Sequence, residues 1–395
     1  MSRHAKSLSV GSENSLHLSL GVLALCFPLP EIQQIINSCG KASQRIRDLP
    51  AAVVAFYIIG ISLYPSVGYE AVLQWLLCGL QWLGSGVFRV SGKASLSRAR
   101  QRLGEEPMRV IFERKALPLA NPLLKGSYWK GLHVVAVDGS TLALQDTASN
   151  REVFGKSSNQ NGEGLYPMAR CVVLTEVGTH VIFDARIGAY KESEVRLAEP
   201  MLAARLQPGM LCLADRLFAG HALWGKAAAT GAHLVWRAKT GLQLTPIKTL
   251  PDGSWLGRWK SSDRSTQIEH EVRVVEYRLA GDSKGEVHRL LTTLLEPSLA
   301  SAEELAMFYP ERWEVELSIK ECKSVLRHNQ VTLRSKLPEM VRQEFWGLLL
   351  AHYIVRKMMA QAAIERGVDP DKLSFKSSVE IIKAAQTGPT ASFFP

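Results

Sequence analysis

The stretch EELAMFYPERWEVELSIKECKSVLR, from Glu303 to Arg327, decides the fold expected of this chain. At about 100° per residue, one narrow helix face would carry four polar groups of different chemistry, from Tyr309, Arg312, Glu316 and Lys323. Apolar side chains cover the other faces, which is typical of a helix that packs on a sheet and leaves a polar stripe at the edge of a site. Ser301 opens a sequence similar to a capping box, and Pro310 predicts a kink or a break. A solvated face with spaced salt bridges is the alternative interpretation.

The Tyr-x2-Arg-x3-Glu-x6-Lys spacing of this stretch resembles the signature of a known family, the DDE transposases of bacterial insertion sequences, in the group named for insertion sequence four. The resemblance covers roughly Pro28 to Lys357. It implies a DNA transposase that catalyses metal-dependent strand cleavage at element ends and strand transfer into target DNA, by cut-and-paste transposition. It also requires two further acidic residues upstream, each at the end of an apolar strand.

The first of these acids is predicted to be Asp138. A short apolar run, His133 to Val137, ends at this residue, as a buried central strand delivers a carboxylate to its carboxyl end. Asp146 is the main local competitor, and Asp138 is preferred because it ends the apolar strand. The residues that follow resemble the family's continuation after its first catalytic aspartate, although Gln145 stands where a proline is expected.

The second acid is predicted to be Asp215, which follows the apolar strand Met210 to Ala214. The sequence Ala214 to Phe218 resembles the family's Asp-Arg motif, which implies that Asp215 is a metal ligand. Arg216 could pair with that carboxylate or contact a DNA phosphate, and an ordinary salt bridge is the alternative.

The three acids Asp138, Asp215 and Glu316 are expected to converge if the two strand ends are neighbours and the helix crosses beside them. Hard carboxylate oxygens suit Mg²⁺ or Mn²⁺, and two such ions roughly 3.5 to 4 Å apart support in-line phosphoryl displacement. Arg312 and Lys323 are expected to hold backbone phosphates. Tyr309 is expected to stack or donate a hydrogen bond near the strand end. Glu314 and Glu321 point away from the stripe and are predicted to be neutral controls.

Composition agrees with a nucleic-acid partner without proving one. The 395 residues carry a net charge of +10, which suits a polyanion. Six scattered cysteines without metal-ligand spacing indicate reduced thiols and no structural zinc. The apolar runs near residues 16–29 and 51–64 are too short for a confident membrane span. We therefore expect a cytoplasmic, nucleoid-associated bacterial protein that binds double-stranded DNA, both terminal inverted repeats and target, and pairs two ends as a homodimer.

Residues 1–122 are predicted to form an all-helical domain that recognises the DNA ends. A basic helix beginning after Gly92 places Arg98 and Arg102 four residues apart on one face. Such a helix could enter a major groove, where arginine reads guanine. A solvated basic face is weighed equally with this interpretation.

Residues 123–360 are predicted to form an RNase H-like α/β catalytic domain, interrupted by a β-rich insertion at about 238–288, with a tail at 361–395. Three tryptophans in or beside the insertion, Trp236, Trp255 and Trp259, are candidates for stacking on a displaced base, although burial in a core is the usual state of tryptophan. Two other functions remain open: a non-transposing RNase H-like nuclease and a catalytically inactive DNA-binding relative.

Overall fold

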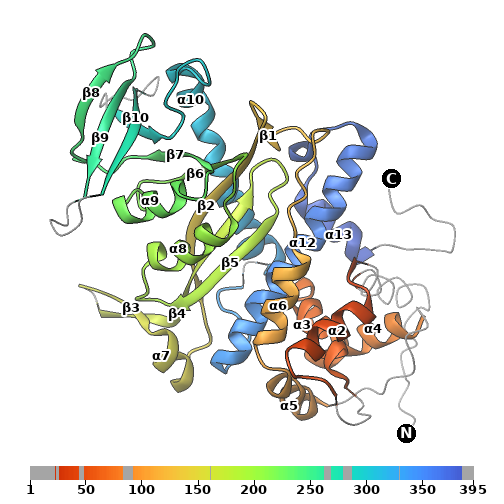
Figure 1. The fold of residues 1–395 in the computed structure, drawn as a ribbon. Coiled ribbons are helices and arrows are strands. Elements are labelled where there is room, and N and C mark those ends of the chain that lie inside the picture. The colour runs from red at the N-terminus through yellow and green to blue at the C-terminus, as the bar shows by residue number, and fades with distance from the viewer. Residues whose placement is uncertain are drawn as a thin grey trace, which may run out of the picture.

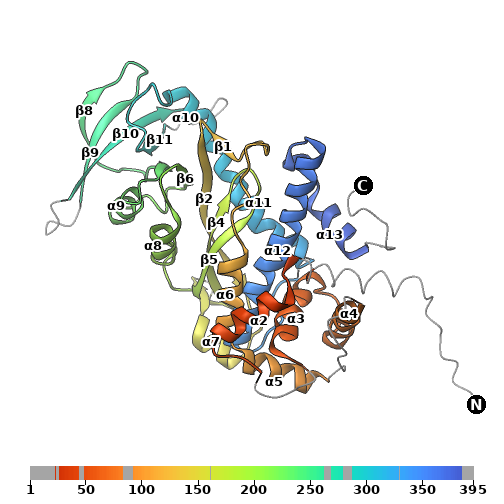
Figure 2. The same cartoon turned by 45° about the vertical axis from the view of Figure 1, so that its right-hand side comes forward.

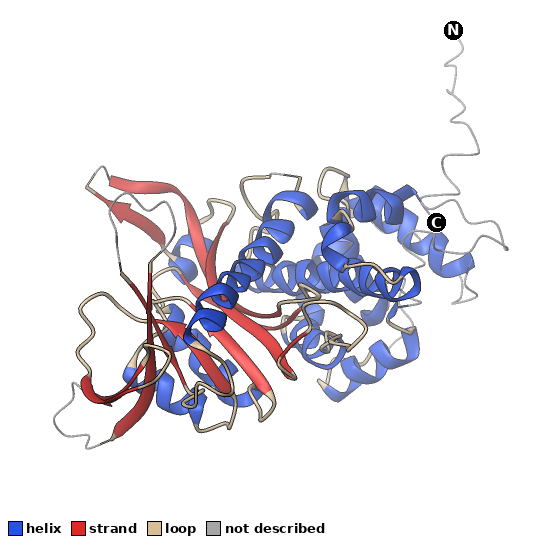
Figure 3. Cartoon of the chain, turned by 90° about the horizontal axis from the view of Figure 1, so that it is seen from above, coloured by secondary structure: helices blue, strands red, loops and turns tan. Residues whose placement is uncertain are grey.

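The protein is described from a computed structural model that covers residues 23, 26–43, 49–82, 92–160, 162–261, 268–278, 287–328 and 330–384. A group of helices and a mixed sheet lie side by side (Figure 1). Seen from above, the strands occupy one side and most helices the other (Figure 3). The fold is therefore mixed α/β with a helical N-terminal region.

The helical region is built around α3, whose residues after Ala51 are all buried. It packs on its neighbours and on a long C-terminal helix, which explains why this apolar run is not confined to one face. The helices are α2 (Leu29–Ser38), α3 (Ala51–Leu63), α4 (Tyr69–Trp82), α5 (Lys93–Leu103), α6 (Glu106–Lys115) and the long α12 (Pro338–Arg366). No helix in the described ranges is both long enough and apolar enough to cross a bilayer.

The sheet is centred on β2 (Leu132–Ala143), which lies between an antiparallel and a parallel neighbour. On one side β4 (Gly162–Glu176) runs antiparallel and pairs in turn with β5 (Ile182–Ala189). On the other side β6 (Met210–Ala214) and then β7 (His233–Arg237) run parallel to β2. The resulting order β5-β4-β2-β6-β7 is that of the RNase H-like core expected from the sequence.

The shorter elements of this half connect or flank the central strands. Helix α8 follows β5 and helix α9 follows β6, and they lie near each other beside the sheet (Figure 1). The elements are β1 (Tyr128–Trp129), α7 (Ala148–Phe154), β3 (Lys156–Asn159), α8 (Glu194–Arg205) and α9 (His221–Ala228).

The β-rich segment after β7 continues the same sheet. Its last strand, β11 (His288–Thr292), pairs antiparallel with β7, and the order then runs through β10 (Glu269–Tyr277), β9 (Trp255–Lys260) and β8 (Thr245–Thr249). Strands were expected here, but as an insertion that interrupts the catalytic fold; main-chain pairing with β7 makes them an extension of the sheet edge. In Figures 1 and 2 they project to one side of the molecule.

The stretch from Glu303 to Arg327 is helical throughout its described part, but not as one regular helix. It consists of α10 (Ala302–Phe308), the 3-10 turn η1 (Tyr309–Trp313), α11 (Glu314–Lys320) and the π-helical turn η2 (Glu321–Leu326). The capping box is confirmed, because Ser301 and Glu304 exchange hydrogen bonds. At Pro310 the α-helix gives way to a 3-10 turn, and the helical path continues into α11 without an intervening loop.

The C-terminal part does not begin as a tail at residue 361. Helix α12 continues to Arg366 and is followed by η3 (Pro370–Lys372) and α13 (Phe375–Ala384). Phe375 is buried against His352 of α12, so this segment packs on the rest of the fold. One continuous hydrophobic core joins α3, α12 and the central strands.

Candidate active site

Two of the predicted acids lie side by side at one edge of the sheet. The parallel pairing of β2 and β6 ends with Val137 opposite Ala214, and the next residues are Asp138 and Asp215. Neighbouring strands lie about 4.8 Å apart, so these two carboxylates start from adjacent backbone positions. The expectation that the strand ends at Asp138 is wrong, because β2 continues in antiparallel pairing with β4 as far as Ala143.

The third acid reaches this edge from α11. The guanidinium of Arg312 has Nη1 3.6 Å from Asp138 Oδ2, and its Nη2 donates to Glu316 Oε1 at 2.9 Å. One buried arginine, with a side chain only 7% exposed, therefore connects a carboxylate of the sheet with a carboxylate of the helix. This geometry places Glu316 on the same arginine as Asp138.

The two remaining signature residues also face the sheet. The hydroxyl of Tyr309 donates to the main-chain oxygen of Ala214 at 3.1 Å, and Lys323 Nζ donates to Ser140 Oγ at 3.1 Å. Tyr309 is buried, so its ring is not available to stack on DNA, but the hydrogen bond expected near the strand end is present. Its contact with the last residue of β6 instead fixes the helix beside Asp215.

The electrostatics of Asp138 show that the three carboxylates interact. Burial raises its pKa to about 6, and the charges of Asp215 and Glu316 add to this rise. The main-chain N–H of Gly139, which donates to Asp138 at 2.7 Å, and the charge of Arg312 oppose it. Mutual repulsion of this kind is what a bound cation relieves.

The donor set fits a hard divalent cation. The converging groups are three carboxylates, and oxygen ligands of this kind are those that Mg²⁺ and Mn²⁺ prefer. Asp215 is only partly buried, and one of its oxygens accepts a hydrogen bond from the Leu217 main chain at 2.8 Å. Arg216 beside it is exposed to solvent.

The local competitor for the first acid lies elsewhere. Asp146 is paired with Arg151 at 2.6 Å and with Lys156 at 3.3 Å. The hydrogen bond from Arg151 lowers the pKa of Asp146, and the contact with Lys156 adds to this shift. It is a charged surface group in an ordinary salt bridge.

The structure contradicts the stacking role predicted for two of the three tryptophans. The ring of Trp236 is fully buried and that of Trp259 is 4% exposed, and both pack against Trp224 in the core. Neither ring presents a free face to a base, which leaves the half-buried Trp255. Both rings pack in the core, as is usual for tryptophan.

The sequence analysis missed Trp313, an aromatic residue beside the acids. It is 56% exposed, and the Arg312 guanidinium lies 4.6 Å from the centre of its ring. Its position between Arg312 and Glu314 was visible in the sequence. Helical periodicity alone gave no reason to expect an exposed tryptophan there.

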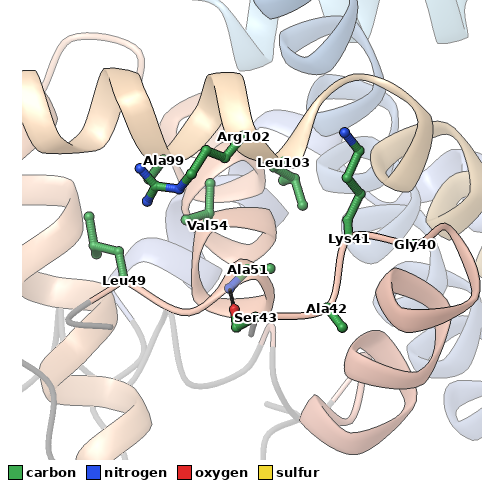
Figure 4. A pocket seen from close by; sticks show the side chains of 10 residues that line it. All are labelled: Gly40, Lys41, Ala42, Ser43, Leu49, Ala51, Val54, Ala99, Arg102 and Leu103. Carbon is green, nitrogen blue, oxygen red and sulfur yellow. Dashed lines mark hydrogen bonds between the residues drawn. The ribbon is translucent and has the colours of Figure 1, made fainter. Parts of the chain in front are cut away.

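Helix α5 presents the two arginines predicted for DNA contact. Arg98 and Arg102 are exposed, whereas Arg100 is buried and bonds to Gln343 and the main chain of Met340 in α12. Arg102 lies over a cavity of about 260 Å³ between α2, α3 and α5, which Lys41 also lines (Figure 4). The outer side of α5 is therefore basic, and its inner side is fixed to α12.

Glu314 and Glu321 point away from the acids, as predicted, but they are unsuitable as neutral controls. Glu314 lies 2.8 Å from His180 Nε2, and Glu321 is paired with Arg356 and His352. Removing either carboxylate would leave buried partners without their counter-charge.

Comparison with known proteins shows the family. Residues 129–354 match a family described as "Transposase DDE domain", and residues 17–113 match "Insertion element 4 transposase N-terminal". The first match contains the strand ends and the whole signature stretch. It covers more than half of the chain.

Individual relatives were also found. The chain is 29% identical over 358 residues to "Transposase InsG for insertion sequence element IS4" of Escherichia coli (strain K12), covering 89% of this chain and 79% of that protein. It is 27% identical over 192 residues to "Putative transposase InsZ" of the same strain, covering 48% and 62%. A cryo-EM structure of a piggyBac transposase synaptic complex with hairpin DNA is similar at a TM-score of 0.44 and 11% identity, covering 94% of this chain and 80% of that one. At that score the structural likeness carries no argument.

Proposed function

The chain belongs to the DDE transposases of the insertion-sequence-four group and catalyses DNA transposition, and from this premise we propose that Asp138, Asp215 and Glu316 are its catalytic metal ligands. The family implies the use of a divalent metal ion. The finer proposal is that two Mg²⁺ ions, or Mn²⁺, bind per active site. The observation that carries it is the ion pairing of Arg312 with both Asp138 and Glu316, beside the adjacent backbone positions of Asp138 and Asp215.

The residues around these ligands have separate tasks. Bound divalent ions supply the Lewis acidity that activates water or a 3′-hydroxyl and stabilises the leaving oxygen. Asp138 must lose its proton to serve as a ligand, and the adjacent charge of Arg312 favours that loss. Tyr309 fixes the helix to β6 through Ala214.

We assign phosphate binding to the basic side chains at the edge of the acidic site. Lys323 lies beside Ser140, two residues beyond Asp138 on β2, where it can hold a backbone phosphate next to the acids. The exposed Arg216 can contact the same DNA strand, and phosphate contacts of this kind position DNA without reading its sequence. Arg312, which was expected to hold a phosphate, is buried and holds Asp138 and Glu316 instead. Trp313, which is largely exposed, and the half-buried Trp255 are candidates for stacking on a base.

End recognition is proposed for the helical front of the chain. The exposed Arg98 and Arg102 on α5 are its candidate base-reading residues, and the match of residues 17–113 to the family's N-terminal region supports a separate role for residues 1–122. We propose catalysis for residues 123–360, with the strands at 238–288 as an extension of its sheet. The partners are terminal inverted repeats and target DNA, bound by a homodimer in the bacterial cytoplasm at the nucleoid.

The test is a cleavage assay on DNA that carries the element's ends. Asp138→Asn, Asp215→Asn and Glu316→Gln each remove a ligand with little change of shape, so each should nearly abolish metal-dependent cleavage while DNA binding persists. Asp146→Asn and Glu303→Gln are matched controls, because both remove an exposed acid from the same region of sequence. Full cleavage by one of the three ligand variants would remove that residue from the site.

A further inference from the structure

The face of the signature helix opposite Glu316 is held by a buried group of charged and polar side chains. We call it the His180 network, and it comprises His180, Glu314, Ser318, Glu321, Arg356 and Asp371. At about 100° per residue, Glu314, Ser318 and Glu321 share one side of the helix, and Glu316 points to the other. None of these residues touches the three acids in the contacts described above.

His180 contacts α11 on both sides of Glu316. It lies in the turn between β4 and β5 with a φ of 58°, a left-handed conformation that is uncommon for residues other than glycine, and it is 4% exposed. Its Nε2 lies 2.8 Å from Glu314 Oε2 and 3.1 Å from Asp371 Oδ1. Its main-chain oxygen accepts a hydrogen bond from Ser318 Oγ at 3.1 Å. One residue of the sheet thus contacts the helix two positions before and two positions after Glu316.

Arg356 extends the network from α11 to α12. Its Nη2 lies 2.7 Å from His180 Nδ1, and its Nε donates to Glu321 Oε2 at 2.9 Å. His352 Nε2 lies 2.9 Å from the same carboxylate oxygen. Arg356 is 4% exposed and His352 is fully buried, so these pairs are shielded from water and need one another.

The hydrogen bonding favours a hydrogen-bonded network around the Glu321–Arg356 ion pair over a second metal centre. Guanidinium groups only donate, so Nδ1 of His180 accepts from Arg356 and the ring proton lies on Nε2, facing Glu314 and Asp371. A cation held by these three residues would need the Nε2 lone pair as well. The imidazole would then carry no proton at all, which an ordinary histidine ligand does not do.

We propose that the His180 network positions Glu316 relative to Asp138 and Asp215, and that the C-terminal segment takes part through Asp371. The proposal rests on the function assigned to the three acids. The helix needs such support because α11 has only seven residues between a 3-10 turn and a π turn, so no long regular hydrogen-bond ladder fixes its rotation. Groups behind a metal ligand commonly change metal affinity or activity by about 10- to 100-fold.

The variants that test this are His180→Asn and Asp371→Asn. Asparagine tolerates the positive φ of residue 180 but cannot span the contacts of the imidazole. Asp371 has a side chain that is 53% exposed, so its replacement leaves the core intact. The control is Asp184→Asn, which disrupts another buried carboxylate, 1% exposed and paired with Arg186 and Arg205 away from the helix.

The readouts are single-turnover cleavage of pre-bound DNA ends over a Mg²⁺ titration, DNA affinity and melting temperature. We expect both test variants to raise the Mg²⁺ concentration for half-maximal rate by about tenfold, with unchanged DNA affinity. Asp184→Asn should lower the melting temperature without changing the Mg²⁺ requirement. An unchanged Mg²⁺ requirement in Asp371→Asn would overturn the proposal.

Two further measurements distinguish a failure of the assigned acids from a failure of the positioning role, and both from a second metal site. If Asp138→Asn cleaves normally, the assignment of the acids has failed, whereas an inactive Asp138→Asn with a normal Asp371→Asn defeats only the positioning role. Calorimetric titration of Mn²⁺ into a protein carrying Asp138→Asn and Glu316→Gln tests the metal alternative. Binding that disappears when Asp371→Asn is added would show a second cation site and overturn the proposal.

Discussion

Replacing Asp138 with asparagine should make the metal-free protein more stable while it destroys activity. Folding raises the pKa of this carboxyl from its ordinary value of 3.8 to about 6, chiefly by burial. The folded protein therefore holds the proton more tightly than the unfolded chain does. The stabilisation from that proton is complete below pH 3.8 and is lost as the pH rises through about 6. Asparagine has no proton to lose.

The size of the effect follows from the pKa. Each pKa unit corresponds to about 1.4 kcal/mol, so the full rise of Asp138 corresponds to about 3 kcal/mol above pH 6. The opposing effects of the Gly139 N–H and of the Arg312 charge are already contained in that net rise, so an uncharged asparagine, whose oxygen still accepts the Gly139 N–H, avoids most of this cost. We therefore expect a gain of about 3 kcal/mol for Asp138→Asn at pH 8, which for a chain of 395 residues corresponds to about 4 °C in melting temperature.

The stability difference is measured by thermal unfolding of the unmodified protein and of Asp138→Asn between pH 4 and 8, in EDTA and in Mg²⁺. In EDTA the advantage of Asp138→Asn should grow with pH and level off above about 6. Mg²⁺ should raise the melting temperature of the unmodified protein, because it binds only the folded state, and should raise that of the variant much less. Asp146→Asn is the control, because the pKa of that surface carboxyl is lowered and its loss should not stabilise the protein. A variant that is less stable than the unmodified protein at pH 8 would refute the reasoning.

Three other predictions concern DNA. Lys323→Ala should weaken strand transfer or end binding in a salt-dependent way, and a DNA affinity unchanged at every salt concentration would reassign Lys323 to a structural contact; Arg312→Ala, which removes the buried partner of Asp138 and Glu316, should lower cleavage without changing the salt dependence of DNA binding. Arg98→Ala with Arg102→Ala should reduce the preference for the element's ends over random duplex in competition binding, because each base contact contributes about 1 to 3 kcal/mol; cleavage of pre-nicked DNA at high protein concentration should survive. Trp313→Ala should weaken binding of single-stranded end DNA by about 1 to 3 kcal/mol, as loss of one stacked base does, whereas Trp236→Ala should instead lower the melting temperature.

The strand ends were predictable because an apolar run followed by an acid reports both burial and position. That pattern placed Asp138 and Asp215 directly after the paired residues Val137 and Ala214 of neighbouring strands, where the structure has them. It did not show that β2 continues past Asp138, because the second half of that strand is only partly buried and its sequence is not continuously apolar. Pairing with β4 extends the strand there, and no local pattern reports the partner of a strand.

Burial of individual aromatic and charged residues was not predictable in the same way. Trp236 and Trp313 each lie next to basic residues in the sequence, yet one is fully buried and the other largely exposed. Glu321 looked like a solvated charge, but its partners Arg356 and His352 come from a helix that follows in the chain. Such partners are set by tertiary packing, which one sequence does not reveal.

The interval between the signature residues follows from the local helix types. Tyr309 and Arg312 belong to one 3-10 turn, in which residues three apart lie in line because the turn has 3.0 residues. The next interval, from Arg312 to Glu316, is four residues and gives an ion pair along the helix, as residues four apart do in an α-helix. Pro310 is compatible with the first turn, since it occupies one of its opening positions, where no donor is required. The change from a 3-10 turn to an α-helix therefore brings Tyr309 and Arg312 into line, so that they contact Ala214 and Asp138, and it places Glu316 one α-helical turn after Arg312, within reach of the same guanidinium.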